Sequence, residues 1–349
     1  MFSTYKPQDV QILLKDITGM VTPLGTKERE AKIQSGTHYS EMLPIEYVPS
    51  KPYLDTFYQA LEKHAKITAY SVASVSQKIW KDKGKSVALV SLARAGTPVG
   101  ILIKHYIQKK YGVDIPHYTI SIIRGKGIDK NAMAYILNRH KPKSIQFVDG
   151  WTGKGAIQAQ LTEALKEYEG VSDGLAVLSD PAGIAEKSGT KEDFLIASSC
   201  LNSTVSGLLS RTFFRKDIIK EKDFHGALFY NELKNDDLTY YFIDTVESFF
   251  DFNDLNTEEN KLSKTGLEEA IAICKEFKIE DINLVKPSIG EATRVLLRRV
   301  PWKILVHSKT DYEHLGHIYQ LAKEKNVEVV EYPLTNYKAC GLIKKLADN

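Results

Sequence analysis

The chain has 349 residues, 43% of them hydrophobic, and a formal net charge of +3. This length suits two domains of a globular protein. No apolar run of about 18 residues occurs, and the polar start lacks a signal-peptide core, so we expect no membrane span and a cytoplasmic location. Cys200, Cys274 and Cys340 are few and far apart, which argues against a disulfide framework or a zinc knuckle.

The first part of the chain predicts a parallel sheet behind a loop-rich hood. Residues 27–49 are polar and interrupted by glycine and proline, which is typical of loops. Apolar residues at three- and four-residue steps predict a long helix over 53–84. Beyond it, expected strands (86–96, 117–123, 144–150 and 174–183) alternate with expected helices (97–112, 131–140 and 156–170). This alternation predicts crossover units and a sheet covered on both faces.

Residues 245–264 are acidic, polar and without clear period, which indicates a linker between domains at 1–255 and 256–349. A second alternation follows, with expected helices (265–277, 290–299, 311–325 and 337–348) and strands (282–286, 302–307 and 327–332). It predicts a small three-layer α/β domain. Residues 261–349 hold 15 Lys and Arg against 12 Asp and Glu, an excess that permits nucleic-acid binding without requiring it.

The stretch "QFVDGWTGKG", residues 146–155, joins a buried strand to a helix. Its three glycines let backbone N–H groups point into one cavity beside a helix N-terminus, which suits a phosphate. Thr152 and Lys154 would add a hydroxyl and a charge. Asp149 would hold sugar hydroxyls or, through water, a magnesium ion. A plain glycine turn between strand and helix is the alternative.

A second loop, "SLARAGTPVG", also ends an apolar strand and opens a helix, and it places Arg94 among small residues. Backbone amides and a guanidinium together can hold a pyrophosphate. Two such loops at the ends of parallel strands suit a ligand with phosphate at both ends, such as phosphoribosyl pyrophosphate.

These two loops resemble those of type I phosphoribosyltransferases over residues 85–180. The strings "IQSGTHYSEMLPIEYVP", "VDGWTGKG", "SDPAGIAEKSGTKEDFLIASSCLNSTVSGLLSRT" and "DFHGALFYNEL" are similar to the phosphoribosyltransferases found beside tellurite-resistance (Ter) operons, a family also labelled cysteine protease StiP. This resemblance covers nearly the whole chain. It implies a type I phosphoribosyltransferase-like sheet domain, a C-terminal Pelota-like RNA-binding domain and a role in stress response.

The resemblance also implies residue roles. The phosphoribosyl and pyrophosphate groups would contact Ala93, Arg94, Ala95, Gly96, Asp149, Gly150, Trp151, Thr152, Gly153, Lys154 and Gly155. The basic loop "IIRGKGIDK" would bring Arg124 and Lys126 over the pyrophosphate and exclude water, and these two residues join Asp149 and Arg94 as catalytic candidates. The commoner loop of these transferases has two adjacent acids, whereas this chain has Asp149 followed by Gly150. This difference favours a non-catalytic ligand-binding regulator as one alternative.

Two polar stretches suggest an acceptor pocket, and helix capping or tight packing is the alternative for them. Its candidate residues are Ser35, Gly36, His38, Tyr39, Glu41, Asp180, Ser199, Cys200, Asn202, Ser203 and Arg211. A peptidase would instead need Cys200 activated by His225 or His38. No local signature joins them, and buried cysteine packing is the commoner role.

In the C-terminal domain, "PSIGEATRVLLRR" and "YPLTNYKACG" resemble the RNA-contacting segments of Pelota-type domains. The matching residues are Gly290, Glu291, Thr293, Arg294, Thr335, Asn336 and Lys338. We therefore expect a phosphoribosyltransferase that uses magnesium with phosphoribosyl pyrophosphate, forms a homo-oligomer and binds structured RNA. A non-catalytic phosphoribosyl-ligand or RNA-binding regulator, and a cysteine peptidase, are the alternatives.

Overall fold

A computed structural model describes residues 2–255 and 265–344, so part of the expected linker, 256–264, lies outside the described residues. Six parallel strands form the main sheet in the order β1-β4-β3-β7-β8-β9. They are β1 Gln11–Ile12, β3 Ala88–Leu92, β4 His117–Ile120, β7 Ile145–Val148, β8 Leu175–Ser179 and β9 Lys187–Thr190. The expected parallel sheet is therefore confirmed, with two further short strands at its edges.

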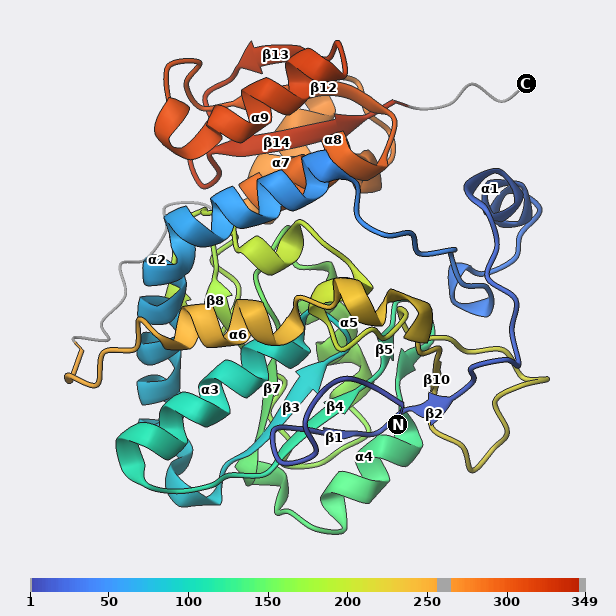
Figure 1. The fold of residues 1–349 in the computed structure, drawn as a ribbon, viewed down its shortest axis with the longest axis vertical. Helices are drawn as coiled ribbons and strands as arrows, with labels where there is room; N and C mark the ends of the chain where they lie inside the picture. The colour runs from blue at the N-terminus through green and yellow to red at the C-terminus, as the bar shows by residue number, and fades with distance from the viewer. Residues whose placement is uncertain (1, 256–264, 345–349) are drawn as a thin grey trace.

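Helices cover both faces of this sheet (Figure 1). One face carries α2 Lys51–Lys83, α3 Gly96–Tyr111 and α6 Thr239–Glu247, and the other carries α4 Lys130–Leu137 and α5 Ala156–Leu165. Neighbouring residues of a strand point to opposite faces. Accordingly Leu89 packs with the α2 and α3 cluster, whereas Val90 packs with Met133 of α4. The central strands β3 and β8 are largely apolar because both of their faces are buried.

Short elements surround the sheet. β2 Lys15–Asp16 pairs with β10 Gly226–Ala227, and β5 Ile122–Ile123 forms an antiparallel hairpin with β6 Gly127–Ile128. The expected loop-rich hood contains a helix, α1 Thr26–Gln34, so that expectation is wrong for this segment. Its sequence is mostly polar, which left no apolar periodicity to detect. The 3₁₀ turns are Tyr39–Glu41, Gly84–Ser86, Pro142–Ser144, Ala197–Ser199, Ser203–Val205, Asn231–Asp236 and Ile282–Leu284.

A second, mixed sheet lies in the C-terminal part, in the order β11-β14-β12-β13. Its strands are β11 Val285–Pro287, β12 Pro301–Val306, β13 Glu328–Glu331 and β14 Ala339–Ile343, and its helices are α7 Gly266–Glu276, α8 Ile289–Arg298 and α9 Tyr312–Glu324. β14 pairs antiparallel with both β11 and β12, and β12 pairs parallel with β13.

The helix expected over 337–348 is a strand where the structure describes it. Residues 339–343 form β14 in the middle of the sheet, and 345–348 lie outside the described residues. A Cβ added at Gly341 would lie 2.9 Å from the Cβ of Val295, so the glycine lets α8 pack closely on the strand. A strand that is covered on both faces has the same short apolar run as a buried helix, which explains the wrong prediction.

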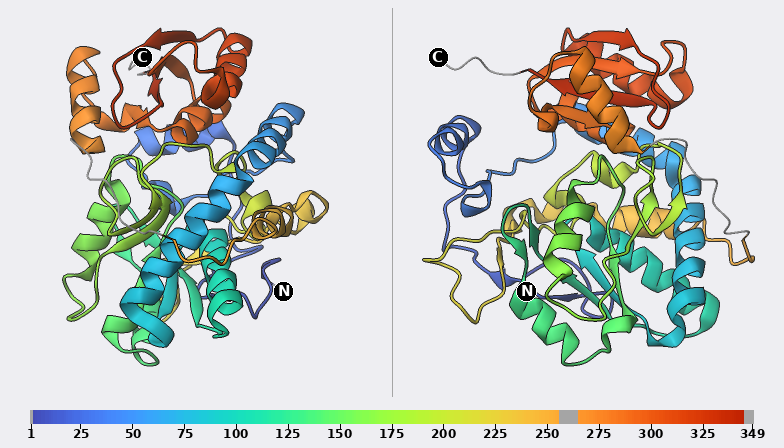
Figure 2. Two further views of the ribbon diagram at one scale, coloured as in Figure 1. Left: turned by 90° about the vertical axis from the view of Figure 1, so that its left-hand side faces the viewer. Right: turned by 180° about the vertical axis from the view of Figure 1, so that it is seen from behind.

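The C-terminal domain stacks on the first half of α2 (Figures 1 and 2). One hydrophobic cluster runs through both domains and includes Leu61 of α2, Ile196 after β9 and Leu296 of α8. The two sheets therefore share a continuous core rather than a wet, loosely packed contact. Among the described residues, no helix is both long and apolar enough to cross a membrane.

Candidate functional site at the domain junction

The two glycine loops that sequence analysis singled out lie side by side at the carboxyl edge of the main sheet. A Cβ added at Gly96, in the Arg94 loop, would collide with the backbone oxygen of Val148 at the end of β7. Only a glycine permits this approach. The Asp149 carboxylate accepts a hydrogen bond from the Gly150 backbone over 2.8 Å, which turns the second loop away from the strand.

Asp180 holds the 149–155 loop in place. Its carboxylate is fully buried and accepts from the Thr152 hydroxyl over 2.6 Å and from the backbone N–H of Ile184 over 3.1 Å. It also pairs with Lys191 at 2.5 Å. With its lone pairs occupied in this way, Asp180 supports the loop, and its place in an acceptor pocket stays a prediction.

The C-terminal domain covers this loop. Lys154 donates to the backbone oxygens of Ile282 over 2.7 Å and of Val285 over 2.8 Å, and the Tyr337 hydroxyl donates to the Gly153 oxygen over 2.5 Å. Burial lowers the pKa of Lys154 to about 8. The sequence predicted that the Lys154 ammonium group holds a phosphate, but here it donates to two backbone oxygens of the C-terminal domain.

Asp149 lies close enough to α8 for the charges of Arg294 and Glu291 to act on its carboxyl. Desolvation raises the pKa of its carboxyl to about 6, and Arg294 opposes the rise. The Arg294 guanidinium stands 5.7 Å from the centre of the Trp151 ring, within cation–π range. Across the described ranges, no group of three or more His, Cys, Asp or Glu side chains is placed to hold a metal ion. Magnesium bound through a ligand at Asp149 stays a prediction.

Arg94 is bound by a residue that sequence analysis missed. Its guanidinium pairs with the Glu46 carboxylate at 3.1 Å and donates to the Leu209 oxygen over 2.9 Å. The Ser203 hydroxyl also reaches Glu46, over 3.4 Å. In the sequence, Glu46 is a single acid among apolar residues in "LPIEYVP". Nothing in the spacing of the residues connects it to Arg94.

The hood contacts the basic hairpin that carries Arg124 and Lys126. The two segments are far apart in the sequence, so the sequence did not predict this contact. The Arg124 backbone donates to the Tyr39 hydroxyl over 2.9 Å, and Lys126 lies 3.6 Å from Glu41. Arg211 donates to the Tyr39 backbone oxygen over 2.6 Å. Ser35 and Gly36, by contrast, are exposed at the end of α1. The Arg124 guanidinium donates to the Asn283 side chain of the C-terminal domain over 2.9 Å. The loop expected to form a lid therefore contacts that domain.

Cys200 follows the 3₁₀ turn Ala197–Ser199 of the first domain, which contacts α8 of the C-terminal domain. Arg298 of α8 donates to the Cys200 backbone oxygen over 2.8 Å and to the Asn202 side chain over 2.6 Å. The thiol is fully buried, and desolvation raises its pKa to about 12 although Arg298 lowers it. The histidines proposed as its partners bind elsewhere, since His225 meets Ser121 at 2.8 Å and His38 meets Ser40 at 2.8 Å.

Most residues expected to bind RNA lie at the same junction. Gly290 and Thr293 are buried, and a Cβ added at Gly290 would meet Ser199 of the first domain at 3.4 Å. Glu291 pairs with Arg294 at 3.1 Å. The Lys338 backbone donates over 2.9 Å to the buried Asp193 of the first domain. In this conformation Gly290 faces the first domain, the Thr293 hydroxyl bonds His317 of α9, and Thr335 is exposed.

Comparison with known proteins places the chain in a family. Residues 3–247 match the family described as tellurite-like stress resistance cysteine protease StiP, and residues 264–345 match the PELOTA RNA binding domain. The chain belongs to the StiP family. It is 36% identical, over 98% of its own length and 94% of the relative, to a protein of Acinetobacter baylyi named cysteine protease StiP.

These matches correct the predicted function. Both names designate a cysteine protease, so the prediction of a phosphoribosyltransferase is overturned and the peptidase alternative is favoured. A xanthine-guanine-hypoxanthine phosphoribosyltransferase of Helicobacter pylori aligns with 39% of this chain and 77% of its own at 18% identity, but its TM-score of 0.22 carries no argument. Glycine loops after parallel strands occur in many folds, which is why they misled the prediction.

Proposed function

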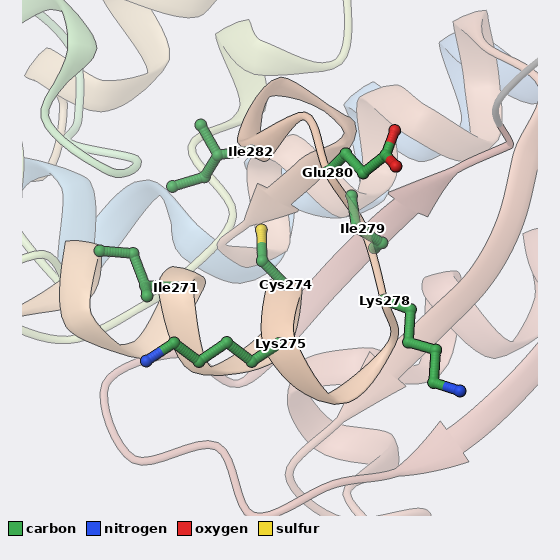
Figure 3. A pocket seen from close by; sticks show the side chains of 7 residues that line it. All are labelled: Ile271, Cys274, Lys275, Lys278, Ile279, Glu280 and Ile282. Atoms are coloured by element: carbon green, nitrogen blue, oxygen red, sulfur yellow. The ribbon is translucent and has the colours of Figure 1, made fainter.

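We propose that this chain is a cysteine peptidase whose nucleophile is Cys200. One observation supports this assignment above the others: of the three cysteines, only Cys200 lies within residues 3–247, the part that matches the cysteine-protease family. Cys274 and Cys340 belong to the segment that matches an RNA-binding domain. Cys274 borders a hollow of about 470 Å³ with Lys275 and Glu280 (Figure 3).

The conformation described is a closed one. A peptidase cysteine attacks as its thiolate, and burial that raises the pKa of Cys200 to about 12 leaves almost none at neutral pH. The positive charges of Arg298 and Arg294 favour the thiolate, so they oppose the rise in the pKa of Cys200 that burial causes. Catalysis therefore requires the C-terminal domain to move from the Cys200 turn and a proton acceptor to reach the thiol.

The test is hydrolysis of fluorescently labelled casein by the full chain. The wild type should cleave slowly, because its thiol is covered, and Tyr337→Phe should cleave faster, because it weakens the contact over the 149–155 loop. Cys200→Ser should abolish both activities, and Cys274→Ser is the matched control that should keep them. The absence of cleavage in both the wild type and Tyr337→Phe, or cleavage that survives Cys200→Ser, would refute the assignment.

We also propose that the C-terminal domain binds RNA, on the support of its match to the PELOTA RNA binding domain. Gel shifts of the full chain with a bent, structured RNA should weaken as salt rises, with a slope that matches about two to four phosphate contacts. Arg294→Ala combined with Lys338→Ala should lower that slope, whereas Lys143→Ala, on the first domain, should not. Absence of any shift at low salt would reject RNA binding.

A further inference from the structure

A pocket of about 280 Å³ opens beside the Cys200 turn, between the hood, the start of α2 and the end of α8. We call it the hood pocket. Six of its lining residues carry the argument: Glu46, Tyr47, Val48, Ser203, Thr204 and Arg298. Its volume is near the lower end of the range for small-molecule sites.

Arg298 brings a positive charge that the protein leaves without a counter-charge. Its guanidinium donates only to neutral acceptors, among them the Asn202 side chain over 2.6 Å and the Cys200 oxygen over 2.8 Å. Within the described residues, no carboxylate lies within ion-pair distance of it, and its buried Nε has no hydrogen-bond partner. Burial lowers the pKa of Arg298 to about 9. An unpaired buried charge is costly, and a bound anion removes that cost.

The acid of the hood pocket, Glu46, acts on Arg298 only from beyond ion-pair distance. Glu46 is already paired with Arg94 at 3.1 Å. A third guanidinium, that of Arg211, lies close behind and also donates to backbone oxygens, those of Tyr39 and Met42. Arg94 lowers the pKa of both Arg211 and Arg298, as neighbouring like charges do. Arg94 and Arg298 thus share the influence of one carboxylate, that of Glu46, and Arg211 adds a further positive charge near Arg94.

Two further features point to a ligand. Thr204 is 2% exposed and lines the pocket, yet its hydroxyl has no hydrogen-bond partner in the described part of the chain. Buried hydroxyls normally have one. At the rim, Tyr47 is 71% exposed and Val48 56% exposed, so large apolar side chains stand open to solvent next to the charged interior. A ligand with an anionic end and an apolar body would satisfy both.

We propose that the hood pocket binds a small organic acid, with its oxyanion group, carboxylate or phosphate, held by Arg298 and Thr204 and its apolar part against Tyr47 and Val48. This site goes beyond the proposed peptidase function and does not depend on it. Binding requires no reactive thiol, so it can succeed where hydrolysis fails.

Calorimetry with the wild-type full chain tests the site with three probes at millimolar concentration: N-acetyl-leucine, its uncharged analogue N-acetyl-leucinamide, and inorganic phosphate. Binding of N-acetyl-leucine indicates a carboxylate ligand, and binding of phosphate alone indicates a phosphorylated one; either supports the site. N-acetyl-leucinamide should bind at least about tenfold more weakly, because it lacks the charge. Equal binding of acid and amide, or no binding of acid and phosphate, would overturn the proposal.

Variants then locate the binding. Arg298→Gln should weaken it by about tenfold or more, the usual effect of losing a charged hydrogen bond. Because Arg298 also contacts the Cys200 turn and its loss can disturb folding, Thr204→Val serves as the second variant. It removes a hydroxyl that has no partner in the protein, so it should weaken binding and leave the melting temperature unchanged. Arg139→Gln, at a distant surface, is the matched control. Unchanged affinity in both Arg298→Gln and Thr204→Val would place the ligand elsewhere.

Discussion

Arg298, the last residue of α8, donates to the backbone oxygen of Cys200 over 2.8 Å. This one contact ties the RNA-binding-type domain to the only cysteine of the protease-type segment. The same guanidinium also donates to the Asn202 side chain, so it holds the turn on both sides of Leu201. Motion of α8 therefore changes the surroundings of the thiol directly.

The reactivity of the three thiols should follow their burial. Cys274 is partly exposed, whereas Cys200 and Cys340 are fully buried, and burial raises the pKa of Cys200 to about 12. Iodoacetamide at pH 8 should therefore modify Cys274 first and Cys200 only slowly. Mass spectrometry of tryptic peptides over time measures the order. Modification of Cys200 as fast as Cys274 would mean that the closed conformation is not the main one in solution.

Asp149 should make stability fall as the pH rises. Burial raises the pKa of its carboxyl from 3.8 to about 6, so between these values the folded chain binds more protons than the unfolded chain. The stability that the Asp149 carboxyl contributes is complete below pH 3.8 and is lost as the pH rises through 6. Asp149→Asn keeps the oxygen that accepts from Gly150 and should stabilise the protein at pH 8 by about 1–2 kcal/mol, a figure reduced because the residue is partly exposed.

Urea unfolding of the wild type and Asp149→Asn at pH 5 and pH 8 tests this expectation. The gain should be small at pH 5, where the wild-type carboxyl is mostly protonated, and larger at pH 8. Asp251→Asn provides an exposed control carboxylate. Equal gains at both pH values would show that the Asp149 carboxyl titrates normally.

His105 should also make stability fall as the pH rises, but in a higher pH range than Asp149. Although burial disfavours its charged form, hydrogen bonds to Asp9 and Glu247 raise the pKa of His105 to about 9. The ring lies 3.0 Å from Asp9 and 2.9 Å from Glu247, and thereby joins α3 to the N-terminal segment and to α6. A raised pKa gives stability that is complete below 6.5 and is lost as the pH rises through 9.

His105→Gln should therefore cost about 1–3 kcal/mol at pH 6. The loss should be clearly smaller at pH 10, where the wild-type ring is neutral too. Denaturant unfolding at the two pH values measures it, with His314→Gln on α9, a more exposed histidine, as the comparison. A loss that does not change with pH would mean that the ring serves only by packing.

Tyr337→Phe should loosen the two domains. The hydroxyl donates to the Gly153 oxygen over 2.5 Å, and Tyr337 is 2% exposed. Its removal should cost about 1–3 kcal/mol, because the buried Gly153 oxygen then lacks this donor. Thermal unfolding measures the loss, and Tyr312→Phe, whose ring is exposed, is the control. No change in Tyr337→Phe would show that this contact does not hold the domains together.

Much of the architecture follows from local sequence pattern. The long helix expected over 53–84 is α2 Lys51–Lys83, and the four expected parallel strands all exist. These elements were predictable because hydrophobic periodicity and continuous apolar runs are local properties of the chain. Where local pattern was weak or ambiguous, as in α1 and β14, the prediction failed. β14 is a strand because β11 and β12 flank it, and both partners are distant in sequence.

The sequence alone determined the positions of the glycine loops, the lone cysteine of the first domain and the hood, and it identified the StiP label among its alternatives. Only the tertiary structure decided what these residues contact. Lys154 binds carbonyls 128 and 131 residues away, and Arg298 reaches back 98 residues to Cys200. Such partners are set by the docking of one domain on another, which buries charges and changes their pKa values. Hydrophobic periodicity specifies which faces are buried, but not which polar groups meet once they are.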